Sequence, residues 1–119
     1  MNQEVYWLLE LAIQPGQREA FELLMAEMVE ATGANEPDVL NYEWNVSADG
    51  TACHIYERYR DSAAALTHLG NFDTHFAERF FALLTPTRFV IYGTPSAELK
   101  QALADSNPLY LAPAGGFRR

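Results

Sequence analysis

Two histidines on a predicted helical stretch are the residues of this sequence best suited to acid–base chemistry. His68 and His75 are seven positions apart, so an unbroken helix would place both side chains on nearly the same face. The ordinary pKa of an imidazole lies close to neutral pH, which suits a general base. Phe72 and Phe76 lie on the same stretch and would supply an apolar wall that excludes water. We expect one of the two histidines to be the catalytic base, and the alternative for each is a structural or surface histidine.

Glu57 is a carboxylate that the strand pattern places on a buried face. It shares that face with Ile55 and Tyr59. A buried carboxylate has either a raised pKa or a cationic partner, and Arg88 on the last predicted strand is a candidate partner. We expect Glu57 to have a structural or dimer-interface role. Arg88 could instead bind a phenolate oxygen of a substrate.

Aromatic side chains alternate along the predicted strands and could either pack or line a pocket. Trp44 and Tyr56 are the candidates for ligand contact, although aromatic residues on paired strands more often pack in a core or a dimer interface. The complete set of candidate substrate-binding residues is Trp44, Tyr56, Phe72, Phe76 and Arg88.

Metal and redox chemistry find little support in the residue spacing. Cys53 is the one cysteine, so an internal disulfide and a CxxC site are impossible. No HxxxH or HExxH spacing occurs, and we expect no metal site. We expect Cys53 to pack as a small hydrophobic side chain.

The composition indicates a globular protein that acts on neither nucleic acid nor membranes. Hydrophobic residues make up 49% of the 119 residues, which is enough for a core. The formal net charge is −8, and Arg118 and Arg119 are the one pair of adjacent basic residues, which argues against phosphate binding. No apolar run approaches the roughly 20 residues that span a bilayer. The N-terminal stretch lacks the basic region of a signal peptide, so we expect a cytoplasmic protein.

The hydrophobic periodicity predicts a mixed sequence of strands and helices. Asp49-Gly50 is a strong hairpin turn signal, Asp61 or Ser62 can cap a helix, and Gly70-Asn71 is expected to break that helix. The predicted elements are a strand over 5–14, a helix over 17–32, hairpin arms over 39–47 and 51–60, helices over 62–71 and 72–84, a strand over 87–93, and a short helix that begins at 94–95, followed by an irregular tail.

This order predicts an α+β fold of the ferredoxin-like βαββαβ plan, a sandwich with an antiparallel sheet, plus a C-terminal helix and tail. Residues 1–95 would form the main unit, and residues 96–119 would belong to the same domain. Helices would cover one face of the sheet, yet the strands carry apolar residues on both faces. A second copy of the sheet is the simplest cover for the other face, which predicts a homodimer.

The stretch HIYERYRDSAAALTHLGNFDTHFAERFFALL (54–84) resembles the antibiotic biosynthesis monooxygenase family of dimeric α/β barrels. The residues that carry the resemblance are Tyr56-Glu57-Arg58-Tyr59, Asp61-Ser62, Ala63 to Ala65 and His68. The resemblance implies a homodimer whose sheets face each other, with a pocket between sheet and helices in each subunit. It also implies oxygenation of a phenolic or quinol-like ring without a metal or flavin.

The leading hypothesis is therefore a cofactor-independent monooxygenase that acts on a small aromatic, quinol or polyketide-like compound, with His68 as the base. A non-catalytic dimeric module that binds a ligand or a protein is the alternative, because a fold does not determine a function. A haem-binding or haem-degrading protein is less favoured. Haem-degrading relatives use an Asn on the first strand and a Trp on the helical layer, and this sequence has neither in residues 5–14 and 62–84.

Overall fold

The strand with apolar side chains on both faces, β1, lies at the centre of a five-stranded sheet in the computed structural model, which describes residues 2–119. It pairs antiparallel with β3 on one side and with β4 on the other. The sheet order β2-β3-β1-β4-β5 contains the predicted ferredoxin-like arrangement in its first four strands. The strands are β1 (Val5–Ile13), β2 (Val39–Val46), β3 (Ala52–Tyr59), β4 (Leu84–Gly93) and β5 (Leu109–Leu111).

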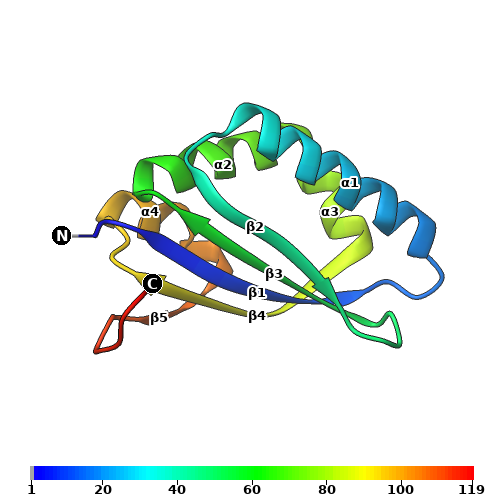
Figure 1. Cartoon of the computed structure of the whole chain (residues 1–119). Coiled ribbons are helices and arrows are strands. Elements are labelled where there is room, and N and C mark those ends of the chain that lie inside the picture. Colours follow the sequence, from blue (N-terminus) through cyan, green and yellow to red (C-terminus); the bar gives the residue numbers. More distant parts are fainter. Residues whose placement is uncertain (1) are drawn as a thin grey trace.

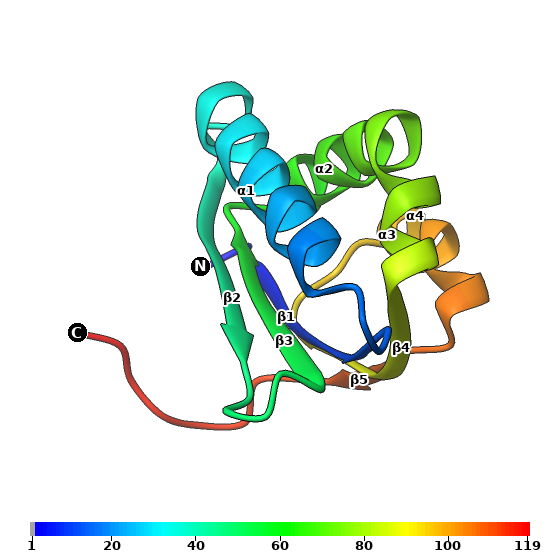
Figure 2. The same cartoon turned by 90° about the vertical axis from the view of Figure 1, so that its right-hand side faces the viewer.

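The helices form one layer over a single face of the sheet (Figures 1 and 2). Asp61 caps the second helix, as predicted, because its carboxylate accepts a hydrogen bond of 2.9 Å from the backbone N–H of Ala64. No helix within residues 2–119 has the length and apolarity needed to cross a bilayer. The helical elements are α1 (Arg18–Asn35), α2 (Ser62–His75), α3 (Ala77–Leu83), α4 (Ala97–Ala102) and the 3₁₀ turn η1 (Ala104–Ser106).

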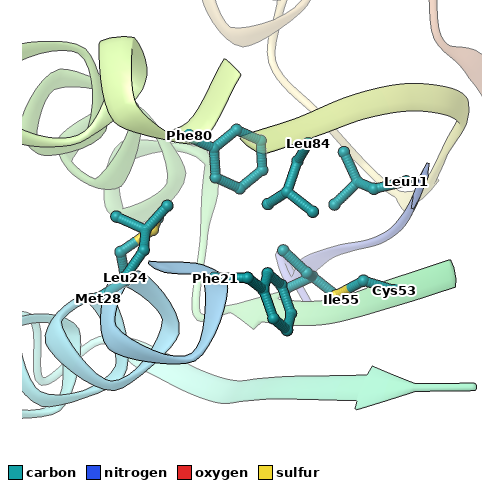
Figure 3. Close-up of a cluster of buried hydrophobic side chains, with 8 residues drawn as sticks. All are labelled: Leu11, Phe21, Leu24, Met28, Cys53, Ile55, Phe80 and Leu84. Carbon is teal, nitrogen blue, oxygen red and sulfur yellow. The ribbon is translucent and has the colours of Figure 1, made fainter. Parts of the chain in front are cut away.

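The core between helices and sheet consists of two hydrophobic clusters. The first lies under α1 and α3, where Phe21, Leu24 and Phe80 pack onto strand residues such as Ile55 (Figure 3). The second lies under α2 and α4 and contains Val5, Trp7, Tyr59, Ala65, Ile91, Leu99 and Leu103. The alternation along β1 and β3 therefore directs one set of side chains to the helices, as the pattern predicted.

The opposite face of the sheet, which we call the outer face, carries a row of tyrosines. The ring of Tyr6 stacks on Tyr92 with centroids 5.3 Å apart and meets Tyr56 edge-on at 6.4 Å. The C-terminal tail reaches one end of this face, where Arg118 forms an ion pair with Glu4. The helices do not cover the outer face (Figure 2).

The predicted helix break at Gly70-Asn71 is wrong, because α2 continues to His75. Gly70 adopts helical geometry in open space, and the side chain of Asn71 donates a hydrogen bond to Glu36 instead of capping a new helix. The helix ends at His75, and the next residue, Phe76, with backbone angles of φ −130° and ψ −20°, separates α2 from α3.

The strand β4, which was predicted to begin at residue 87, begins three residues earlier, at Leu84, and includes Pro86. A register irregularity lies opposite Glu10 and Leu11, and the neighbouring strand β5 pairs only with Val90 to Tyr92. The missing N–H of Pro86 therefore leaves no gap in the ladder to β5. The tail, predicted to be irregular, contains β5, which pairs parallel to β4.

Candidate active site

A cavity of about 390 Å³ lies between the helices and the sheet, where the two core clusters meet. Its walls are mainly aromatic and aliphatic, with Trp7 and Ile55 from the sheet and Phe72 and Phe80 from the helices. Its volume lies in the range of sites for small organic molecules. His68 belongs to the wall, and core side chains do not fill the cavity.

The imidazole of His68 lines this cavity between two buried carboxylates. Its Nδ1 lies 2.9 Å from Oε1 of Glu36, the residue that follows α1. Its Nε2 lies 3.3 Å from Oε1 of Glu57 on β3. His68, Glu36 and Glu57 are 6%, 8% and 5% exposed, so water screens these interactions weakly. The helix end, the second helix and the sheet thus each contribute one group to an acid–base cluster.

The two carboxylates favour the protonated form of His68. Burial would lower the pKa of His68, but the hydrogen bond to Glu36 and the negative charges of Glu57 and Glu36 together raise it above the ordinary value. Burial would likewise raise the pKa of Glu36, and the bonds to His68 and Asn71 hold it below the ordinary value. When the ring of His68 is protonated, each of its nitrogens therefore has a carboxylate acceptor, and of these two carboxylates only that of Glu57 lines the cavity.

Two tyrosines complete the surroundings of this cluster. The hydroxyl of Tyr59 donates a hydrogen bond to Oε1 of Glu57, so Tyr59 and His68 approach the same carboxylate oxygen. Burial and the charge of Glu57 raise the pKa of Tyr59 far above its ordinary value, which keeps the phenol neutral. The ring of Tyr42 lies 5.3 Å from the ring of His68 and lines the cavity. The second carboxylate oxygen of Glu57, Oε2, makes no hydrogen bond to any described residue.

Comparison with known proteins places the residues of this cluster within a known family. The model of the antibiotic biosynthesis monooxygenase family matches residues 5–78, which include Glu57 and His68. The chain belongs to the antibiotic biosynthesis monooxygenase family. The family that the sequence resemblance indicated is thereby confirmed. No curated protein matches this sequence.

Solved structures of several bacterial proteins share the fold. MupZ from Pseudomonas fluorescens superposes with a TM-score of 0.85 and 28% identity, over 99% of this chain and 96% of that one. SnoaB from Streptomyces nogalater, a cofactor-independent oxygenase, superposes with a TM-score of 0.64 and 19% identity, over 80% of this chain and 96% of that one. Rv0793 from Mycobacterium tuberculosis gives a TM-score of 0.58 and 28% identity, over 74% and 91% of the two chains.

Three of the side chains singled out in the sequence meet at the cavity of this family member, namely His68, Phe72 and Glu57. His75 does not, although it follows His68 on the same helix. Seven residues of helix separate the two histidines by about 10 Å along the axis. His75 is therefore exposed at the end of α2, beyond the cavity.

The other predicted contact residues lie elsewhere. Trp44 packs in the first core cluster, with its ring centroid 6.0 Å from that of Phe21. Phe76 packs against the same cluster at the junction of α2 and α3. Tyr56 and Arg88 project from the outer face, because their positions on β3 and β4 alternate with the cavity-lining ones.

Arg88 is not the partner of Glu57. Its side chain is 61% exposed, and the nearest carboxylate is that of Glu10 at 3.9 Å, on the outer face. The charged partner of Glu57 is His68 instead. Glu57 does occupy the buried position that the strand pattern predicted.

Glu36 is the member of the site that sequence reasoning missed. An acid directly after a helix normally belongs to the solvated surface, and Glu36 lies 32 residues from His68 along the chain. Only the packing of the end of α1 against α2 brings the two together. No group of three or more His, Cys, Asp or Glu side chains within residues 2–119 has an arrangement that could hold a metal ion.

Proposed function

We propose that this protein is a cofactor-independent monooxygenase that oxidises a small aromatic or polyketide-like compound with an acidic phenol, quinol or enolisable C–H group. The observation that carries the proposal is the carboxylate of Glu57 at an apolar cavity, next to the imidazole ring of His68. A deprotonated ring of this kind is electron-rich enough to reduce oxygen itself. The protein then needs to remove a proton, hold the anion and exclude water.

In the proposed reaction Glu57 accepts the substrate proton through its free oxygen Oε2. The imidazolium of His68 and the neutral phenol of Tyr59 both contact Oε1 and hold the carboxylate in place. The positive charge of His68 also stabilises the substrate anion that forms in the cavity. Where a CH₂ group is oxidised, one oxygen atom ends as the carbonyl of the product, and the other leaves as water with the two hydrogens of that carbon.

Oxygen uptake with a panel of quinols and enolisable polycyclic ketones tests this function. We expect wild-type protein to accelerate uptake and to place labelled oxygen in the product, and Glu57→Gln to lose about 10²–10⁴-fold in kcat. His75→Ala is the matched control, because His75 is exposed beyond the cavity, and it should retain wild-type activity. Equal rates for wild type and Glu57→Gln with every compound would refute the assignment of the base.

We also propose that the protein works as a homodimer through the outer face of the sheet. The support is the partly exposed row of Tyr6, Tyr56 and Tyr92 with Leu8 on a face that the helices leave open. A second copy would cover these apolar surfaces and produce the barrel that the family resemblance implies.

A further inference from the structure

The segment after β4 forms part of the cavity wall and brings two polar residues to it. Asp105 and Ser106 on η1 belong to the cavity wall, together with Leu103. The family match ends at residue 78, so this part of the wall lies outside it. The superposition on SnoaB covers 80% of this chain, whereas the superposition on MupZ covers 99%. Figure 1 shows α4 at the end of the sheet where β1 begins, and α4 packs there beside α2.

Burial separates the cavity into an inner end and a mouth. Glu57 and His68 are almost completely buried and mark the inner end. Asp105 and Ser106 are exposed, and so is Phe81, which is 56% exposed and lines the cavity as well. A ligand that reaches both ends would therefore place one group at the acid–base cluster and another beside η1.

The side chains of Asp105 and Ser106 are not needed to hold their own turn. Backbone hydrogen bonds hold it, from the N–H of Ser106 to Leu103 (3.0 Å) and from the N–H of Asn107 to Ala104 (3.1 Å). Within the part of the chain that the structure describes, neither side chain makes a hydrogen bond. Both are thus available to a molecule in the cavity.

We propose that Asp105 and Ser106 form a subsite for a hydroxyl group on the part of the substrate remote from the reacting ring; this inference rests on the proposed function for the identity of the inner end. A carboxylate only accepts hydrogen bonds, whereas a Ser hydroxyl both donates and accepts. A substrate hydroxyl can donate to Asp105 and accept from Ser106. An ammonium group could donate to both side chains but would offer no acceptor to the Ser106 hydroxyl proton, and a substrate carboxylate would be repelled by Asp105.

Calorimetric titration of the full chain, without turnover and under nitrogen, tests the subsite. The probes are phenylalkanols of increasing chain length, their methyl ethers, which lack the donor, and the corresponding phenylalkylamines. We expect the best alcohol to bind about tenfold more tightly than its ether, the scale of one hydrogen bond to a charged acceptor. The double variant Asp105→Ala/Ser106→Ala should bring alcohol and ether to nearly equal affinity. Glu98→Ala, an exposed acid on α4 that does not line the cavity, is the control and should retain the preference.

Three results would overturn the subsite: no binding of any alcohol, no preference for the alcohol over the ether, or an unchanged preference in the double variant. Tighter binding of the amine than of the alcohol would show that the group recognised is a cation, which also contradicts the proposal. Because this assay involves no oxygen, its outcome is independent of the oxygen-uptake test. A protein that oxygenates quinols in a Glu57-dependent manner without preferring alcohols would disprove the subsite alone.

Discussion

The contacts of a single imidazole determine how the acid–base cluster responds to pH. Because the pKa of His68 is raised above 6.5, its interaction with the carboxylates is fully present below that pH and is lost as pH rises through the raised value. The pKa of Glu36 is lowered below 4.5, so its contribution is present above 4.5 and is lost as pH falls through the lowered value. Between pH 4.5 and pH 6.5 the cluster therefore contributes its full stabilisation.

We predict that the ring of His68 titrates above 6.5 and that the free energy of unfolding declines over the same alkaline range. Two-dimensional NMR of the histidine ring signals gives the titration, and urea denaturation at a series of pH values gives the decline. A His68 signal that titrates at or below 6.5 would contradict the imidazolium assignment, and with it the role of Glu57 as the free acceptor.

The charge of Glu36 should affect both the stability of the protein and the pH dependence of its activity, although Glu36 does not line the cavity. Glu36→Gln keeps the shape of the side chain but removes one of the two negative charges that raise the pKa of His68. We expect the variant to be less stable by about 1–3 kcal/mol, and the alkaline limb of its pH–rate profile to move to lower pH. Urea denaturation and the pH dependence of kcat measure the two effects. A purely structural role for Glu36 would lower stability without moving the profile.

At the scale of single residues, the sequence predicts a group when its own neighbours reveal its environment. Glu57 alternates with Ile55 and Tyr59, so its burial follows from the strand pattern. His68 lies on a helix with aromatic neighbours, which pointed to a pocket. Glu36 and Asp105 have polar, exposed-looking neighbours, and only the packing of distant elements gives them a place near the site.

Elements were predictable where the periodicity was long, and their boundaries were not. The order of the first four strands and of the helices between them follows from alternation, the hairpin turn and the Asp61 cap. The break in the helical layer was misplaced because Gly-Asn is a frequent stop signal, whereas here Asn71 contacts Glu36. The strand β5 was missed because three residues between prolines carry no period, and its parallel pairing with β4 depends on where the chain returns.

Gly70 offers a direct test of the continuous helix α2. A Cβ at this position meets no atom within 4 Å, and the residue lies inside the helix. Gly70→Ala should therefore stabilise the protein by about 0.5–1 kcal/mol, because Ala loses less backbone entropy in a helix. Chemical denaturation monitored by circular dichroism gives the difference. A destabilised variant would indicate that the chain leaves helical geometry at Gly70.

At Gly93 the same substitution to alanine should destabilise the protein instead. Its φ of +91° is in the range that favours glycine, and a Cβ there would collide with the backbone oxygen of Glu4. Gly93→Ala should cost about 2–4 kcal/mol through the unfavourable φ and the displaced strand β1. The same denaturation experiment measures the change in the free energy of unfolding. A decrease no larger than that of an ordinary surface substitution would show that β1 and β4 can separate at this end without cost.

At the scale of the whole molecule, the expectation of a dimer depends on a sheet that has a helical layer on one face only. The apolar residues on both faces of β1 predict this imbalance, because one helical layer cannot cover two faces. Leu8 lies on the outer face between Tyr56 and Val90, its pairing partners on β3 and β4. The C-terminal tail reaches this face near Glu4 and leaves the tyrosine row partly exposed.

The dimer can be tested with two matched substitutions of leucine by aspartate. Leu8→Asp places a charge on the outer face, and burial of that charge against a second copy would cost several kcal/mol, so the variant should sediment as a monomer. Leu23→Asp places the same charge on α1, where Leu23 is 65% exposed on the helical side, and should leave the dimer intact. Sedimentation velocity at micromolar concentration gives the mass of each species, and circular dichroism confirms that both variants fold. If wild type and Leu8→Asp sediment alike, the outer face is not a dimer interface, and its tyrosines pack only against residues of their own chain.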